Sequence, residues 1–199
     1  MLRVKSARWL FRAHRLCSST ANPAYLHSLI TSQPPPQDTT VVRDEYTAKK
    51  ALRVLKLLED EPGRIHACDT EVGDINLARE SPVGNGTVTC ASVYSGPDVD
   101  FGTGPRLWID NLGAAEGTLD LFKEFFEGKA AKKVWHNYSF DRAVMHNHGV
   151  DCMGLGGDTM HMARLWDTAR LTEGGYSLEA LTQHLLGTPK RNMKVRRMG

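Results

Sequence analysis

The sequence predicts an α/β protein in which a sheet of mixed strand direction is flanked by helices. Short apolar runs rich in β-branched residues predict strands, and segments with apolar residues at helical spacing predict amphipathic helices. Their order along the chain is typical of a sheet covered by helices. We expect helix 45–60, strands 65–71, 87–94 and 107–109, helix 116–127, strand 133–136, and helices 139–148, 158–168 and 177–186.

Glycine, proline and serine supply the expected boundaries. Pro62 and Gly63 end the first helix, a Gly-Asn-Gly turn at 84–86 precedes the second strand, and Gly128 ends the second helix. We expect Ser139 to cap the helix that follows the fourth strand, because a serine side chain can accept a hydrogen bond from the first helical turn.

Charge is distributed unevenly along the 199 residues. Residues 1–37 and 188–199 together hold ten of the 25 Lys and Arg and none of the 23 Asp and Glu. The segment 38–187 therefore has 15 basic and 23 acidic residues, a net charge of −8. Such a body is not a basic surface for nucleic acid. Any phosphate backbone would have to be received through metal ions or through parts outside this chain.

The basic ends frame one expected domain at 40–187, which is long enough for a core of its own. Basic residues in the first 37 positions recur at helical spacing without any acid, which is typical of an organelle transit peptide, mitochondrial or plastid. The alternative is a basic arm that binds anions nonspecifically. A proline run at 34–36 predicts an extended linker, and 188–199 is expected to be an unstructured basic tail.

The cysteines form no CxxC pair, which argues against a zinc ribbon and against a disulfide framework. We expect Cys68 and Cys90 to be core residues with free thiols. The spacing of His146, His148 and Cys152 fits no usual zinc site, so we expect these to be surface residues. No apolar stretch approaches the roughly 20 residues of a membrane span, and nothing indicates an oligomer.

Two carboxylates stand at the end of the first strand. Asp69 and Glu71 are two positions apart, so they share a face of the strand, where they repel each other unless a cation lies between them. Asp141, in the first turn of helix 139–148, would join them if the first and fourth strands are neighbours. Hard oxygen ligands suit Mg²⁺, with Mn²⁺ as an alternative, and two such ions about 4 Å apart can activate water. Alternatively, the pair is a solvent-facing strand edge and Asp141 a helix-start acid.

These residues resemble a known family. Asp69-Thr70-Glu71 after an apolar run resembles the first motif of the DEDD 3′–5′ exonucleases, which have a ribonuclease H-like fold, and the segment 137–141 resembles the second. The order of Gly-Asp-Thr-Met at 157–160 and Tyr-Ser-Leu-Glu at 176–179 is similar to the proofreading domain of family A, DNA polymerase I-like enzymes. With the leader, the chain resembles the N-terminal portion of an organellar DNA polymerase.

The resemblance implies roles for the acids. Asp69 would bridge two metal ions, Glu71 would bind the ion that activates water, and Asp141 would hold the second ion. The reaction implied is hydrolysis of the terminal phosphodiester at a single-stranded 3′ end of DNA, which releases nucleoside monophosphates.

The resemblance also implies substrate contacts. Thr70 and Asn137 would help to seat the 3′ nucleotide. Trp135 and Phe140 are expected in the core, with stacking of an aromatic near the cleft on a base as the alternative; Phe140 is a candidate substrate contact. Asp158 could be a metal ligand, but we expect it to be a helix N-cap.

The family's third motif, Tyr-x-x-x-Asp, supplies a fourth carboxylate and a tyrosine. Tyr176 is followed four residues later by Ala180, so it does not start this motif. We therefore expect the motif, and a polymerase domain, beyond residue 199, which makes the domain C-terminally incomplete and inactive as truncated. Two other functions stay open: a stand-alone exonuclease acting on RNA or structured DNA, and a non-catalytic ribonuclease H-like module that binds nucleic acid.

Overall fold

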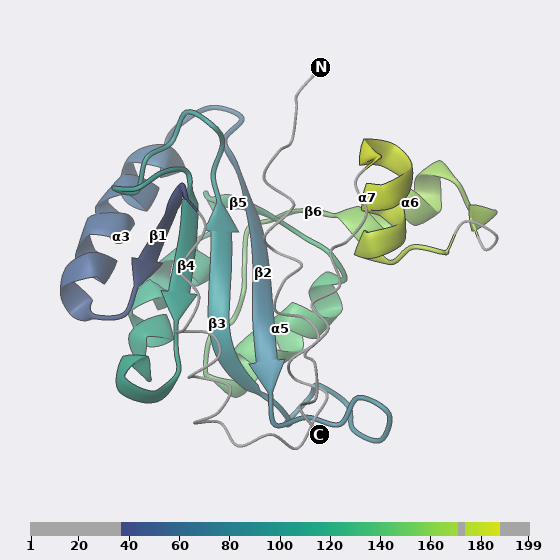
Figure 1. Ribbon diagram of the computed structural model, residues 1–199, viewed down its shortest axis with the longest axis horizontal. Helices are drawn as coiled ribbons and strands as arrows, with labels where there is room; N and C mark the ends of the chain where they lie inside the picture. The colour runs from purple at the N-terminus through teal and green to yellow at the C-terminus, as the bar shows by residue number, and fades with distance from the viewer. Residues whose placement is uncertain (1–36, 171–173, 188–199) are drawn as a thin grey trace, which may run out of the picture.

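The computed structural model describes residues 37–170 and 174–187, so almost all of the expected leader, and the expected basic tail, lie outside the described residues. Its centre is a six-stranded sheet in the order β1-β4-β3-β2-β5-β6 (Figure 1). The strands are β1 (Thr39–Val42), β2 (Ile65–Gly73), β3 (Thr87–Tyr94), β4 (Arg106–Asp110), β5 (Lys132–Trp135) and β6 (Leu155–Asp158). The helices are α3 (Glu45–Glu59), α4 (Lys123–Glu127), α5 (Tyr138–Asn147), α6 (Thr159–Trp166) and α7 (Leu178–Leu186), with short 3₁₀ turns at Gly113–Ala115 and Thr118–Phe122.

The sheet is mixed, as the sequence predicts. Strands β2, β3 and β4 are joined in antiparallel fashion, whereas β1 pairs with β4, β5 with β2, and β6 with β5 in parallel. The first and fourth predicted strands, β2 and β5, are therefore neighbours, which is the condition that the acid cluster requires.

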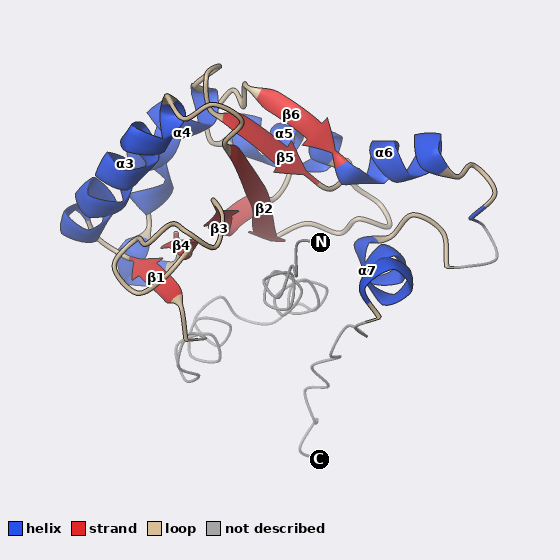
Figure 2. Ribbon diagram, turned by 90° about the horizontal axis from the view of Figure 1, so that it is seen from above, coloured by secondary structure: helices blue, strands red, loops and turns tan. Residues whose placement is uncertain are grey.

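Helices α3, α4 and α5 lie on one face of the sheet, and α6 continues from β6 beyond its edge (Figure 2). The apolar stripe of α3 faces the core, because its residues at helical spacing are the buried ones: Ala48, Ala51, Leu55 and Leu58. The helix begins where the Asp44 carboxylate accepts a 2.8 Å hydrogen bond from the Thr47 N–H. Trp135 at the end of β5 is buried in the same core, as expected.

The predicted helix 116–127 is wrong as one unit. A 3₁₀ turn comes first, and α4 has only five residues. The Asn111 side chain, just after β4, accepts hydrogen bonds from the Gly117 and Leu119 N–H groups at 3.0 and 3.2 Å. Gly117 has φ 85, a left-handed conformation that interrupts a helix, so the polar anchor and this glycine shorten the helix.

Strands β1 and β6 were not expected. Each has four residues, and β6 reads Leu-Gly-Gly-Asp, which lacks the β-branched residues that mark strands in a sequence. Both form because a parallel neighbour supplies hydrogen bonds, β4 for β1 and β5 for β6. β1 reads Thr-Thr-Val-Val, whose β-branched residues favour a strand, whereas β6 is decided by pairing that its local composition does not report.

Cys68 and Cys90 are buried, as expected, but Cys152 corrects the surface prediction because only 2% of it is exposed. His148 has a structural partner: its Nε2 accepts a 2.9 Å hydrogen bond from the Val88 N–H. Within 37–170 and 174–187, no helix is both long enough and apolar enough to span a membrane.

Candidate active site

The two strand acids lie in the half of β2 that extends past β5. Residues 65–67 of β2 pair with residues 132–134 of β5. β5 ends at Trp135, and the chain then leaves the sheet and forms α5. Asp69 is half-buried and Glu71 is 8% exposed, opposite Ser92 and Cys90 of β3 respectively. A side chain from α5 can therefore approach β2 where β5 no longer covers it.

Asp141 makes that approach. Its Oδ1 accepts two hydrogen bonds from Thr70, one from the backbone N–H at 3.0 Å and one from the hydroxyl at 2.7 Å. Thr70 is the residue between Asp69 and Glu71, so the two segments singled out in the sequence meet although they are 71 positions apart. Sequence reasoning gave Thr70 a substrate contact and missed this partner.

Burial dominates the protonation of Asp141. Asp141 is 3% exposed, and the loss of hydration raises the pKa of its carboxyl to about 7. The two Thr70 hydrogen bonds act in the opposite direction, and the negative charge of Asp158 adds to the increase. A nearby cation would favour the charged form, so this carboxylate has the chemistry of a metal ligand.

A β-bulge lies next to Glu71. The register passes from Glu71 opposite Cys90 to Val72 opposite Val88, which leaves Thr89 without a facing partner. The Thr89 hydroxyl donates to the Glu71 carbonyl at 3.0 Å and satisfies this distorted backbone. Bulges re-aim side chains beside functional sites, and this one directly follows the second strand acid.

The start of α5 differs from the prediction. Its N-cap is Asn137, not Ser139, and Asn137 has φ 66 and ψ 52 with no capping hydrogen bond from its own side chain. The Ser139 hydroxyl donates to Asn137 Oδ1 at 3.3 Å instead. The predicted cap is wrong because a residue distant in the sequence, Asp158, takes over its role.

Asp158 is the N-cap of α6, as expected, and it also binds α5. Its carboxylate accepts from the Asn137 and Tyr138 N–H groups at 3.0 and 2.8 Å, and from the Met160 and His161 N–H groups at 2.9 and 3.4 Å. Burial raises the pKa of Asp158, but these hydrogen bonds outweigh it and leave the pKa below its usual value. No local signal in the sequence reports the bond to α5.

Asp141 contacts Thr70, the residue between the two strand acids. In the part of the chain that the structure describes, no three His, Cys, Asp or Glu side chains form a group that could hold a metal ion. The donor atoms are hard oxygens of the kind that Mg²⁺ and Mn²⁺ prefer, so their chemistry fits the expected ions. The assignment of Asp69, Glu71 and Asp141 as ligands stays a prediction.

The aromatic candidates have other partners. Phe140 is half-buried and packs against the core, so its predicted stacking on a base stays a prediction. The Tyr176 hydroxyl donates to the Asp167 carbonyl at 2.9 Å, and the Arg164 guanidinium lies over its ring, 5.5 Å from the centroid. Tyr176 thus has a local structural role, consistent with its exclusion from the third motif.

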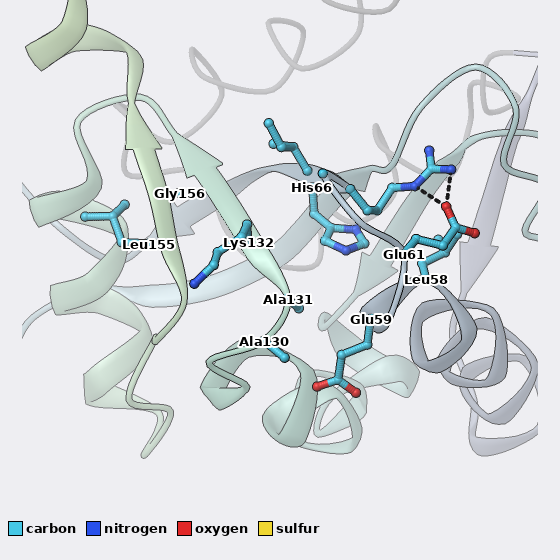
Figure 3. A pocket seen from close by; sticks show the side chains of 12 residues that line it. Leu58, Glu59, Glu61, His66, Ala130, Ala131, Lys132, Leu155 and Gly156 are labelled. Carbon is cyan, nitrogen blue, oxygen red and sulfur yellow. Dashed lines mark hydrogen bonds and ion pairs between the residues drawn. The ribbon is translucent and has the colours of Figure 1, made fainter.

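A pocket of about 510 Å³ lies at the opposite end of β2, near its first residues (Figure 3). Its lining includes Arg64, His66 and Lys132, and none of the three predicted acids. Arg64 is paired with Glu61 and Asp98. This pocket is therefore separate from the acids on β2.

Comparison with known proteins assigns the family. The profile of the 3′–5′ exonuclease family matches residues 41–197. The chain is 48% identical over 147 residues to DNA polymerase I A, chloroplastic/mitochondrial, of Arabidopsis thaliana, covering 73% of this chain and 14% of that protein. It is 50% identical over 139 residues to DNA polymerase I B, mitochondrial, of Oryza sativa subsp. japonica, covering 67% of this chain and 13% of that protein.

Solved structures share the fold. RNase D of Trypanosoma brucei matches with a TM-score of 0.56 at 15% identity, over 79% of this chain and 50% of that one. The POL domain of Pol1 from M. smegmatis matches with a TM-score of 0.54 at 13% identity, over 77% of this chain and 23% of that one. The ribonuclease H-like fold is thereby confirmed. The chain spans about a seventh of the plant polymerases it matches, and it belongs to the 3′–5′ exonuclease family.

Proposed function

We propose that this chain carries the proofreading 3′–5′ exonuclease domain of an organellar DNA polymerase of the DNA polymerase I type. Its reaction is hydrolysis of the 3′-terminal phosphodiester of single-stranded DNA, with release of nucleoside monophosphates. The relatives are DNA polymerases that are about seven times longer than the matched segment, so we also propose a polymerase domain in the same polypeptide.

The contact between Thr70 and Asp141 is the observation that carries this proposal. It joins the two motif segments at the half of β2 that extends past β5, inside the region that matches the exonuclease family. Burying a carboxylate is unfavourable unless other interactions compensate for the lost hydration. A solvent-facing strand edge would therefore not bring the buried Asp141 carboxylate against its backbone. The alternative of an incidental helix-start acid is therefore disfavoured.

The family generally uses divalent metal ions. Asp69, Glu71 and Asp141 would hold them here, and we propose two Mg²⁺ ions, with Mn²⁺ able to substitute. When bound, such ions lower the pKa of water and stabilise charge on the leaving oxygen. The fourth carboxylate and the tyrosine are proposed to come from a Tyr-x-x-x-Asp helix beyond residue 199.

Within this chain, each residue has a task that its contacts support. Thr70 holds one oxygen of Asp141, which leaves the carboxylate oriented toward β2. Asn137 and Phe140 are the proposed contacts of the 3′ nucleotide, since both lie at the start of α5, just before Asp141.

The test is exonuclease activity on a defined strand. The chain extended through its own downstream Tyr-x-x-x-Asp segment is incubated with Mg²⁺ and a 5′-labelled single-stranded DNA. We expect a ladder that shortens by one nucleotide per step, and Asp69→Asn should reduce the rate at least 100-fold. The matched control is Asp120→Asn, an exposed acid on the 3₁₀ turn, which should keep the wild-type rate. Wild-type activity in Asp69→Asn would refute the assignment.

The same assay separates the alternatives. A strong preference for RNA of the same sequence would favour a stand-alone ribonuclease, and binding without hydrolysis would favour a non-catalytic module. Organellar targeting, proposed from the basic leader and the names of the relatives, is tested by fusing residues 1–40 to a fluorescent protein. A diffuse cytosolic signal would exclude it.

A further inference from the structure

The Asp158 carboxylate connects two helices. It accepts four backbone N–H groups, two from the start of α5 and two from the first turn of α6. Capping aspartates ordinarily serve the helix they precede. Asp158 therefore does more than end β6 and start α6.

The helix served at a distance is the one that carries Asp141. Asn137 supplies no cap of its own and sits at φ 66, a conformation that is uncommon for residues other than glycine. The N–H groups of Asn137 and Tyr138 point instead at Asp158, and Asp141 follows in the first turn of the same helix. The direction in which α5 leaves the sheet thus depends on this carboxylate.

A second tie reinforces the connection. His136 Nδ1 lies 2.8 Å from the Thr159 hydroxyl, which in turn donates to the Trp135 carbonyl at 3.2 Å. The β5–α5 and β6–α6 junctions are thereby held to each other at two consecutive positions, 158 and 159. The Asp158 side chain is only 9% exposed, so water cannot easily replace it.

We propose that Asp158 is a positioning residue for the nuclease site, which fixes the start of α5 so that Asp141 reaches Thr70. The expected effect on catalysis rests on the proposed function, whereas the expected effect on the contact between Asp141 and Thr70 does not. Asp158 does not touch the reacting atoms; it acts through α5. A displacement of about 1 Å in a reacting constellation can lower a rate by about 100-fold, so loss of this bond should be visible in turnover.

The critical variant is Asp158→Ser. Serine is a good N-cap and should still serve α6, but one hydroxyl cannot also bind both N–H groups of α5. The matched control is Asp44→Ser, because Asp44 is likewise an aspartate N-cap, on α3, with no bond to a second helix. Asp158→Asn is the conservative variant, since its amide oxygen can keep the three bonds of Oδ1 and loses that of Oδ2 to Tyr138.

The first readout does not depend on activity. In the 199-residue chain, the amide resonance of Thr70, whose N–H is bonded to Asp141, should shift in Asp158→Ser, stay in place in Asp44→Ser, and shift less in Asp158→Asn. If Asp158→Ser fails to fold, Asp158→Asn supplies the comparison. An unchanged Thr70 resonance in both Asp158 variants would overturn the inference.

The second readout is turnover of the extended polypeptide. Asp158→Ser should lower kcat by about 10- to 100-fold and raise the Mg²⁺ concentration for half-maximal rate. KM for DNA should rise as well, because Asn137, a proposed nucleotide contact, donates to the same carboxylate. A general loss of stability would lower the melting temperature without moving the metal requirement. A wild-type polypeptide without exonuclease activity would refute the proposed function, and the Thr70 resonance would still decide whether Asp158 positions Asp141.

Discussion

Thr70 binds one oxygen of Asp141 twice, with its backbone N–H at 3.0 Å and with its hydroxyl at 2.7 Å. This contact joins strand β2 to helix α5 at the candidate site. It also places a threonine of the Asp-Thr-Glu segment in a supporting role, where it orients an acid.

Replacing Thr70 by valine removes the hydroxyl and keeps the shape of the side chain. The buried carboxylate then loses one of two hydrogen bonds, which should lower the free energy of unfolding at pH 8 by about 1–3 kcal/mol, and by less at pH 5. Urea unfolding at both pH values measures this. Thr89→Val is the control, because its hydroxyl donates to a neutral carbonyl and its effect should not depend on pH. Equal losses for Thr70→Val at both pH values would contradict the prediction.

Asp141 should make stability fall as pH rises. Its pKa is about 7 in the folded chain against an ordinary value of 3.8, so between these pH values the folded chain binds one proton more than the unfolded chain. Unfolding free energy therefore declines from about pH 4 to pH 7 and levels off above that. His66 acts oppositely, because burial lowers its pKa to about 4. The measurement is thus the difference between wild type and Asp141→Asn, which cancels His66. A flat difference curve from pH 4 to 8 would contradict this prediction.

Divalent cations should stabilise the chain more at high pH than at low pH. A proton on Asp141 competes with a metal ion, so Mg²⁺ or Mn²⁺ should raise the melting temperature more at pH 8 than at pH 5. Asp69→Asn should remove most of the increase, and Asp120→Asn should preserve it. Differential scanning fluorimetry gives the shifts. An equal increase in all three proteins would indicate nonspecific ion binding.

Gly154 should be intolerant of a side chain. It has φ 68, and a Cβ there would lie 2.4 Å from the Ala131 carbonyl and 2.6 Å from the Gly128 carbonyl, both of which accept from the buried Lys133 ammonium. Gly154→Ala should lower stability by about 2 kcal/mol or more beyond the backbone strain.

The control for this clash is Gly63→Ala. Gly63 has φ 77 with no atom within 4 Å of its Cβ position, so it carries the backbone strain alone, about 1–2 kcal/mol. Chemical denaturation of both variants measures the difference. Equal effects would show that the Ala131 and Gly128 carbonyls around Lys133 can move aside at little cost in stability.

The sequence predicts this fold well where periodicity is local. The stripe of α3 appears as expected, since it depends on residues within one element. β3 forms at the expected residues 87–94, although residues 88–91 are buried in succession rather than in alternation. The prediction fails for β6, whose two glycines give no strand signal and whose pairing depends on β5. The division of helix 116–127 likewise depends on Asn111, which lies outside that segment, just after β4.

In the candidate site too, the sequence predicts features set within one element and misses features set by contacts between elements. Asp69 and Glu71 share a strand, and their spacing alone indicates a shared face. The approach of Asp141 could be expected only if two strands were assumed to be neighbours. The bonds from Asp158 to α5 could not be expected, because the parallel pairing of β6 with β5 creates them and neither strand composition nor spacing reports that pairing.

The sheet has short outer strands. β1 and β6 are its two margins, and each is four residues long, whereas the inner strands β2 and β3 have nine and eight. Unpaired peptide groups along a sheet margin are templates on which other molecules add strands and aggregate. In the described residues, each margin offers only four residues of backbone for such addition.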